Sequence, residues 1–114
     1  MATGIRTILY PVTDLDAARA SFTRLLGTEP TSDSPYYVGF TIDGQEIGLA
    51  PKDPTQADTG VVPYVHVSDI DAALAQFVAD GGSVSRPVTA VGPGRRIAVA
   101  TDRDGNVVGM LQDA

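Results

Sequence analysis

The sequence predicts an α+β fold built from two βαβββ modules, and three observations predict it. The segment VTDLDAARASF at residues 12–22 returns as VSDIDAALAQF at residues 67–77. Both copies carry apolar residues at helical spacing, and a run of β-branched and aromatic residues typical of a strand precedes each. At 114 residues the chain has the usual length of one domain. We therefore assign residues 1–114 to a single domain, with modules at residues 1–50 and 61–114.

The first module is predicted from its local patterns. Its helix begins after the capping signal formed by Thr13 and Asp16, in which the hydroxyl accepts from a backbone N–H, and it ends at Gly27, which suits a left-handed C-cap. An Asp-Gly pair, a strong hairpin signal, separates the last two strands. The four strands are expected at residues 5–12, 28–31, 36–42 and 45–50.

The second module repeats the same order of elements. Its helix follows the capping signal of Ser68 and Asp71 and ends at Gly81 and Gly82. A second Asp-Gly pair precedes its last strand, whose sequence DGNVVGML echoes DGQEIGLA of the first module. The strands are expected at residues 61–67, 83–88, 95–101 and 106–111, and residues 51–60 form a linker between the modules.

Composition and charge exclude several classes of function. The net charge is −6, from 14 acidic and 8 basic residues, and such a field repels the phosphate backbone of nucleic acids. No apolar run approaches the roughly 20 residues of a membrane helix. The chain has no cysteine, which excludes disulfides and cysteine-based zinc sites. Because the first residues lack the basic, apolar and cleavage regions of a secretory signal, a cytoplasmic location is expected.

Each predicted module has a helix on one face of its strands and nothing on the other. A sheet face that stays uncovered is unfavourable, so the two modules are expected to pair, with curved mixed sheets around a concave groove and the helices outside. A concavity of this kind is a natural site for a small molecule.

The segments YPVTDLDAARASFTRLLG and GPGRRIAVATDRDGNVVGML resemble the opening and closing elements of the vicinal oxygen chelate superfamily. This superfamily contains glyoxalases, extradiol dioxygenases, and fosfomycin- and bleomycin-resistance proteins. The resemblance covers nearly the whole chain and implies the fold described above. It also implies a homodimer, in which the modules pair within one chain or are exchanged between two. Because this fold supports several chemistries as well as pure binders, the resemblance says little about activity.

In metal-dependent members of that superfamily, each half supplies a histidine or glutamine from its first strand and a glutamate from its last. The matching positions here hold Thr7, Gly48, Val62 and Gly109. None of these side chains is a strong ligand for a divalent ion. A shift of the alignment by one residue would offer only Glu46 and His66. We therefore expect neither a metal nor another cofactor.

Strand alternation, counted from the positions that the resemblance matches, places the candidate ligand-binding residues on the faces turned away from the helices. The resemblance also implies that one arginine lies in a loop at the rim. They are Thr7, Leu9, Glu46, Gly48, Val62, Tyr64, His66, Arg96, Gly109 and Leu111. Most of them form an apolar wall with a few polar groups, which suits an aromatic or amphipathic ligand, although an ordinary core would show the same alternation.

Each candidate has a structural alternative to its functional interpretation. His66, the only histidine, either contacts a ligand or is a partly exposed residue at a strand end. Glu46 either attracts a cationic ligand or is a solvated charge beside a turn. Arg96 and its neighbour Arg95 either bind an anion or form a solvated pair on a hairpin. The glycines of the last strands either widen the floor of the groove or are small residues left after a metal site was lost.

The function expected from the sequence is a metal-independent small-molecule binding protein of the glyoxalase/bleomycin-resistance type, such as one that sequesters an antibiotic or a metabolite. Its ligand is expected to be a small organic compound, cationic or aromatic. One alternative is an enzyme, either a lyase or isomerase in which His66 and Glu46 would act as acid and base, or a dioxygenase-like protein with an unorthodox metal site. Another is a module without a ligand, whose apolar face serves dimer assembly. No catalytic residue is assigned.

Overall fold

A computed structural model describes residues 2–52 and 60–113. The chain divides into two compact units. The first unit spans residues 7–62, and the second combines residues 1–6 with residues 63–114. Within the predicted linker at residues 51–60, residues 53–59 lie outside the described residues. The assignment of the whole chain to a single domain stays a prediction.

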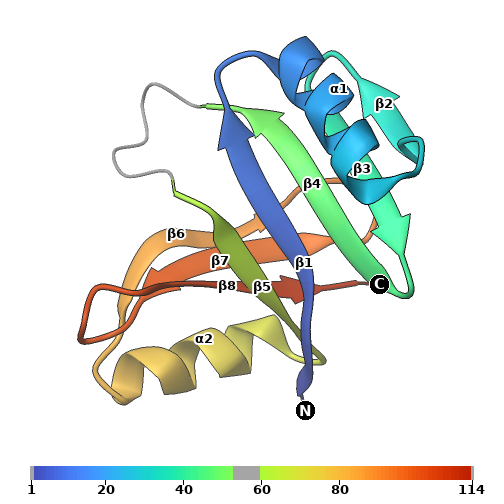
Figure 1. The fold of residues 1–114 in the computed structure, drawn as a ribbon. Coiled ribbons are helices and arrows are strands. Elements are labelled where there is room, and N and C mark those ends of the chain that lie inside the picture. Colours follow the sequence, from blue (N-terminus) through green and yellow to red (C-terminus); the bar gives the residue numbers. More distant parts are fainter. Residues whose placement is uncertain (1, 53–59, 114) are drawn as a thin grey trace. The chain divides into compact units, whose positions relative to one another are not determined.

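The described residues of the first unit form four strands and one helix. The elements are β1 (Ala2–Val12, of which residues 7–12 belong to this unit), α1 (Leu15–Leu26), β2 (Ser32–Ser34), β3 (Tyr37–Ile42) and β4 (Gln45–Pro51). The strand order is β2-β3-β4-β1, and only the β1–β4 pair is parallel. Helix α1 lies on β3 and β4 (Figure 1).

The core of the first unit lies between α1 and one face of the strands. Val38, Phe40 and Leu49 are fully buried there. They alternate with glycines and polar residues along β3 and β4, as expected for strands with one face on a core. The partly buried residues that pack against them come from α1 and the neighbouring strands: Tyr10, Leu15, Ala18, Phe22, Leu26 and Ile47.

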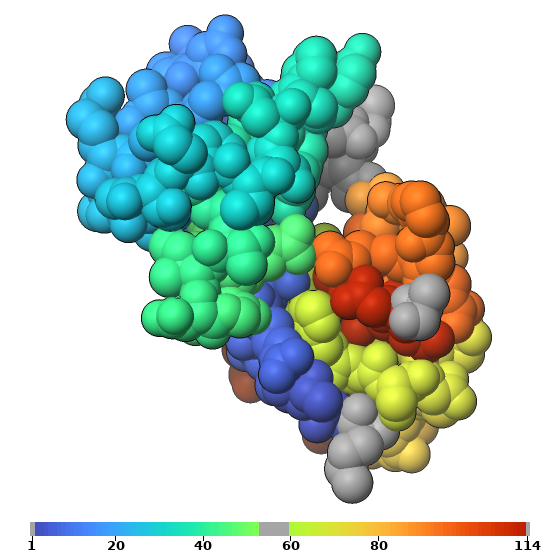
Figure 2. Space-filling view, turned by 90° about the vertical axis from the view of Figure 1, so that its right-hand side faces the viewer, coloured from blue at the N-terminus to red at the C-terminus, as the bar shows by residue number. Residues whose placement is uncertain are grey.

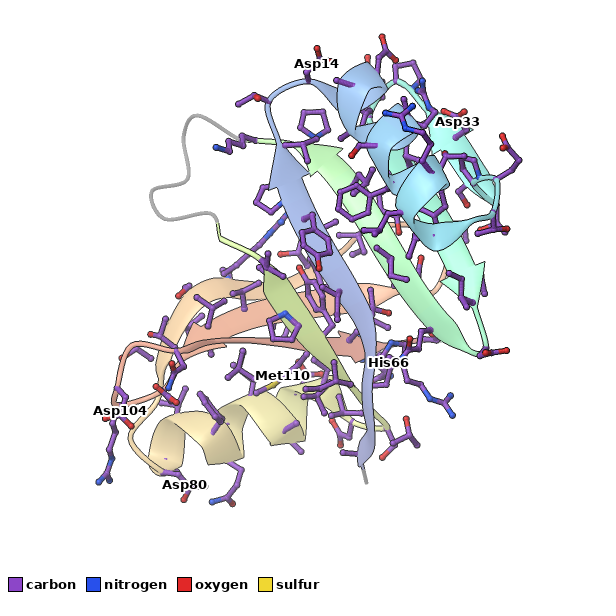
Figure 3. The ribbon with its side chains drawn as sticks, in the orientation of Figure 1. Asp14, Asp33, His66, Asp80, Asp104 and Met110 are labelled. Atoms are coloured by element: carbon purple, nitrogen blue, oxygen red, sulfur yellow. The ribbon has the colours of Figure 1, made fainter. Side chains whose placement is uncertain are left out.

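The second unit repeats this arrangement and confirms the predicted α+β fold with two βαβββ modules. Its elements are β5 (Val62–Val67, of which residues 63–67 belong to this unit), α2 (Ile70–Ala79), β6 (Ser83–Ala90), β7 (Arg96–Thr101) and β8 (Val107–Gln112). The strand order is β5-β8-β7-β6, again with the first and last strands of the module parallel. Ile70, Ala98 and Met110 form the core, and Met110 points from β8 toward α2 (Figure 3).

The helix starts are correct, but the predicted capping residues are wrong. Asp14 caps α1 by accepting a hydrogen bond from the backbone N–H of Ala17 at 3.0 Å, and Asp69 caps α2 by accepting from Ala72 at 3.1 Å. The predicted hydroxyl residues, Thr13 and Ser68, each stand one position before the cap. The C-cap prediction for α1 is confirmed, because Gly27 adopts a left-handed φ of 72°.

The second strand of the first module is also displaced from its prediction. The expected strand at residues 28–31 is wrong, and β2 begins at Ser32. Pro30 has no N–H to donate to a ladder, and Thr31, which donates to the carbonyl of Gly39 at 2.8 Å, is the last residue before the strand. The Asp-Gly turn before β4 is confirmed, since Asp43 and Gly44 have φ values of 48° and 80°.

None of the helices in the described part of the chain is long and apolar enough to cross a membrane. The cytoplasmic location stays a prediction.

Candidate functional site

The strand register defines a helix-distal face in each unit, meaning the face of the strands opposite the helix. Directly paired residues in neighbouring strands point to the same side. In the first unit, Thr7 pairs with Glu46, and Leu9 pairs with Gly48, which in turn pairs with Gly39. The buried core residues of the same strands occupy the intervening positions. Glu46 and Gly48 therefore share the helix-distal face, as alternation predicts.

The ring of Tyr37 covers the two glycines of this face. A Cβ built on Gly48 would lie 2.7 Å from the Tyr37 hydroxyl, and one on Gly39 would lie 2.8 Å from the ring atom Cε2. The hydroxyl donates to Glu46 Oε2 at 2.9 Å, and the Thr7 hydroxyl donates to the other carboxylate oxygen at 3.3 Å. Tyr37 was not among the residues predicted from the sequence. It stands two residues before Gly39 on the same face of β3, and this spacing could have indicated that its ring lies on that face.

In the second unit Tyr64 covers the last-strand glycine, but from the first strand of its module, whereas Tyr37 lies on the third strand of the first module. Tyr64 pairs with Gly109, and His66 pairs with Leu111. A Cβ built on Gly109 would lie 2.5 Å from Tyr64 Cδ1, so the ring lies directly over the glycine. Tyr64 is only 4% exposed, and this burial raises the pKa of its hydroxyl, while the positive charge of Arg86 acts in the opposite direction. The hydroxyl is therefore a neutral donor at neutral pH.

These contacts overturn one interpretation of the two last-strand glycines. Gly48 and Gly109 do not widen a floor within their units, because tyrosine rings from Tyr37 and Tyr64 fill the space above them. The glycines are required for another reason: any side chain would collide with a ring already packed there.

The two arginines predicted at the rim have acidic partners within the second unit. Arg95 binds the Asp113 carboxylate through Nε at 2.7 Å, and this hydrogen bond lowers the pKa of Asp113. His66 Nδ1 lies 3.9 Å from the same carboxylate. Arg96 lies 3.2 Å from Asp71 across the start of α2. Both arginines therefore form ion pairs with aspartates of this unit, a pairing that the sequence did not predict.

The other predicted ligand residues are distributed over both units. Val62 begins β5, Leu9 is half-buried on β1, and Leu111 is buried on β8. His66 lies on β5 with its side chain 17% exposed (Figure 3). Glu46 lies on β4 of the first unit and His66 belongs to the second.

An open pocket in the first unit was not predicted. It has a volume of about 650 Å³ and lies where the start of α1 meets β2, two elements that are side by side in Figure 2. Arg19 of α1 joins them through an ion pair with Asp33 of β2 at 3.0 Å, and it also pairs with Asp16 of its own helix at 2.9 Å. A contact between a helix and a strand that follows a loop leaves no local pattern in the sequence. The lining residues are Thr13, Asp14, Leu15, Asp16, Arg19, Asp33, Ser34 and Pro35, and Figure 3 labels two of them.

Residues 4–110 match the Glyoxalase/Bleomycin resistance protein/Dioxygenase superfamily. The chain belongs to this superfamily. Curated relatives in Mycobacterium bovis and Mycobacterium tuberculosis, each named "Putative glyoxylase CFP32", are 31% identical to it over 110 residues. That match covers 88% of this chain and 42% of the relatives, so the chain spans less than half the length of the curated relatives it matches.

Solved structures of the superfamily show the same fold. The Mn(II)-bound glyoxalase from Novosphingobium aromaticivorans is 24% identical, with a TM-score of 0.72 over 98% of this chain and 39% of that one. The Streptomyces coelicolor methylmalonyl-CoA epimerase is 22% identical, with a TM-score of 0.71 over 100% of this chain and 99% of that one. At these identities the similarity shows the fold alone.

The residues of this chain do not fit the metal that the superfamily implies. The last-strand position of each module holds a glycine, and a tyrosine ring takes the space that a ligand side chain would need. Within residues 2–52 and 60–113, no group of three or more histidine, aspartate and glutamate side chains is arranged to hold a metal ion.

Proposed function

We propose that this chain is a small-molecule binding protein of the glyoxalase/bleomycin-resistance type that works without a metal. One observation carries the proposal. In both modules the last-strand position predicted for a metal-binding glutamate is a glycine that packs beneath a tyrosine ring. A missing glutamate ligand could be replaced by a ligand from another part of the protein. The tyrosine rings, however, fill the space above the glycines, which leaves no room there for an ion with its ligands.

The helix-distal faces carry the features that a binding protein needs. They combine ring and aliphatic surface with a few polar groups, among them the Glu46 carboxylate oriented by the hydroxyls of Thr7 and Tyr37. Such a mixture of apolar walls and fixed polar groups is typical of small-molecule sites. A protein that sequesters a metabolite or an antibiotic as its ligand is consistent with this arrangement. We further propose that the protein is a homodimer, because the isologous pair is the commonest assembly of such modules.

The experiment is a thermal-shift screen of a library of small organic compounds in the presence of a chelator. A ligand that binds only the folded state stabilises it by mass action and so raises the melting temperature. At a free ligand concentration of about 100 Kd, the free energy of unfolding increases by about 2.7 kcal/mol. We expect hits that persist with the chelator present and that bind without being converted. Hits that appear only after a divalent ion is added would contradict the proposal.

The competing function is an enzyme of the same superfamily, a lyase, isomerase or dioxygenase-like protein. The name of the mycobacterial relatives is the observation in its favour. Mass spectrometry of each hit after incubation with the protein distinguishes the two functions. An unchanged compound supports binding, whereas a product that forms in proportion to protein concentration supports catalysis.

A further inference from the structure

A single row of residues crosses the helix-distal face of the second unit. Tyr64 on β5 pairs with Gly109 on β8, Gly109 pairs with Val99 on β7, and Val99 pairs with Arg86 on β6. Paired residues point to the same side of a sheet, so all four lie on one face. The neighbouring positions Ala98 and Met110 belong to the core beneath α2. Arg86 thus lies on the same face as Tyr64, away from the helix.

Irregular pairing on both sides of Arg86 turns this residue onto that face. Val84 pairs with Ala100, and a regular ladder would then place Arg86 opposite Ala98, on the face that α2 covers. Register shifts between Val84 and Arg86, and again between Arg86 and Thr89, place it opposite Val99 instead. Bulges of this kind re-aim a side chain and are over-represented beside active sites. The regular pairing of the edge strand β6 with β7 is therefore interrupted at Arg86, the residue whose guanidinium the strand carries on this face.

The Arg86 guanidinium has no acidic partner among the described residues, although the residue is half-buried. Arg95 and Arg96, in the same unit, are both paired with carboxylates. Tyr64 likewise makes no hydrogen bond to another described residue through its hydroxyl. Arg19 Nε is the one side-chain nitrogen or oxygen among the described residues that is fully buried without a hydrogen-bond partner, so the Arg86 guanidinium and the Tyr64 hydroxyl both keep access to solvent. Both groups are therefore available to an external ligand that supplies an acceptor.

Tyr64 and Arg86 stand at the two ends of this row. Their backbones are three strand spacings apart, roughly 14 Å, and the Tyr64 ring already lies over Gly109, the next residue of the row. The charge of Arg86 acts on the Tyr64 hydroxyl, which places the two groups within electrostatic range. Between them lie only the glycine and Val99. A planar acidic group could therefore contact the guanidinium and the phenol at once.

We infer that Arg86 and Tyr64 form a binding subsite for the carboxylate or phosphate group of a small organic anion on the helix-distal face of the second unit. This inference deepens the proposed function, on which it rests, by naming the chemical class of the ligand. It replaces the cationic ligand expected from the net charge of −6. The overall field acts at long range, whereas a half-buried guanidinium acts at the site itself. The fork of the guanidinium matches either group in a bidentate manner, and the tyrosine adds a neutral donor.

The test uses four probes that share one ring and differ in charge: benzoate, phenyl phosphate, benzamide and benzylamine. Titrations followed by two-dimensional amide NMR give affinities and the location of binding. We expect the two anions to bind roughly tenfold or more tightly than benzamide and benzylamine, with shifted amides on β5 to β8. The tighter of the two anions identifies whether the natural group is a carboxylate or a phosphate.

Three variants assign the effect to residues. Arg86→Gln should reduce the affinity for the anions by roughly tenfold or more and leave the neutral probe unaffected. Arg103→Gln is the matched control, because it removes the same charge from an exposed arginine of the same unit. Tyr64→Phe keeps the ring over Gly109 and removes only the hydroxyl, so it should weaken the anions by about threefold. Circular dichroism and melting temperature establish that each variant is folded.

Three results would overturn the inference. The first is benzylamine or benzamide binding as tightly as benzoate with no effect of Arg86→Gln; the proposed function then stands and the anion subsite fails. The second is an equal loss in Arg86→Gln and Arg103→Gln, which would show only the effect of net charge. The third is no shift with any probe at about 10 mM, weaker than any specific anion site. The library screen tests the proposed function independently of all three.

Discussion

Replacing Gly109 with alanine tests whether a tyrosine ring occupies the space over β8. The added Cβ would lie 2.5 Å from Tyr64 Cδ1 and 2.8 Å from Cε1, well inside van der Waals contact. The ring is 4% exposed, so it cannot move aside without disturbing its neighbours. Overpacking of this kind costs about 1–3 kcal/mol. Because alanine also reduces the entropy of the unfolded chain, which returns about 0.4–1 kcal/mol, we expect a net loss of up to about 2.6 kcal/mol, and a loss of about 1–3 kcal/mol relative to a glycine-to-alanine change that makes no such contact.

Urea denaturation followed by circular dichroism measures this loss as a lower midpoint at an unchanged slope. Gly60→Ala is the control, since no heavy atom of the described residues lies within 4 Å of a Cβ built there. Gly48→Ala should cost less than Gly109→Ala, because the atom nearest its Cβ is the hydroxyl end of half-buried Tyr37. If Gly109→Ala were as stable as Gly60→Ala, the ring would not occupy this space and the reasoning about both glycines would be refuted.

Three further predictions follow from the same contacts. Asp14→Ala should lower the free energy of unfolding by about 1 kcal/mol, whereas Thr13→Ala should change it little, since only the aspartate caps α1; equal losses in urea would contradict this. Asp113 has a lowered pKa because of its hydrogen bond from Arg95, so its contribution is fully present above the unfolded value of about 3.9 and is lost as the pH falls through the lower folded pKa. Asp113→Asn should flatten the acid limb of a pH–stability profile, and an unchanged limb would count against the pair. Gly109→Glu should bind no metal and should melt below Gly109→Ala, and a calorimetric titration with Zn²⁺ that shows a site would contradict this.

Much of the fold could be predicted because each module repeats the same local signals. Apolar spacing, the Asp-Gly turn and the terminal glycine of α1 are local patterns, and the structure confirms the elements they predict. Two predictions were wrong, the helix-capping residues and the position of β2. The caps were misassigned because two neighbouring residues could each accept the capping hydrogen bond. Thr13 and Asp14 can both accept an N–H bond, and only the backbone geometry selects Asp14. The short β2 carries no apolar alternation, so its position was not encoded locally.

The candidate site was less predictable because side-chain direction depends on register. Alternation placed Glu46 and Gly48 on the same face, which the strand pairing confirms. It could not show that Tyr37 covers Gly48, because that contact joins two strands. Arg86 was missed for a related reason: two register shifts in β6 reverse its facing, and simple alternation does not predict a bulge.

The most direct test of the central claim is the metal content of the protein. The chain is dialysed against micromolar zinc, manganese, nickel or iron, washed, and analysed for its elements. Because glycine and tyrosine occupy the space of the family's metal ligands, we predict far less than one ion per chain in every case. About one tightly held ion per chain, lost when His66 or Glu46 is replaced, would contradict the account.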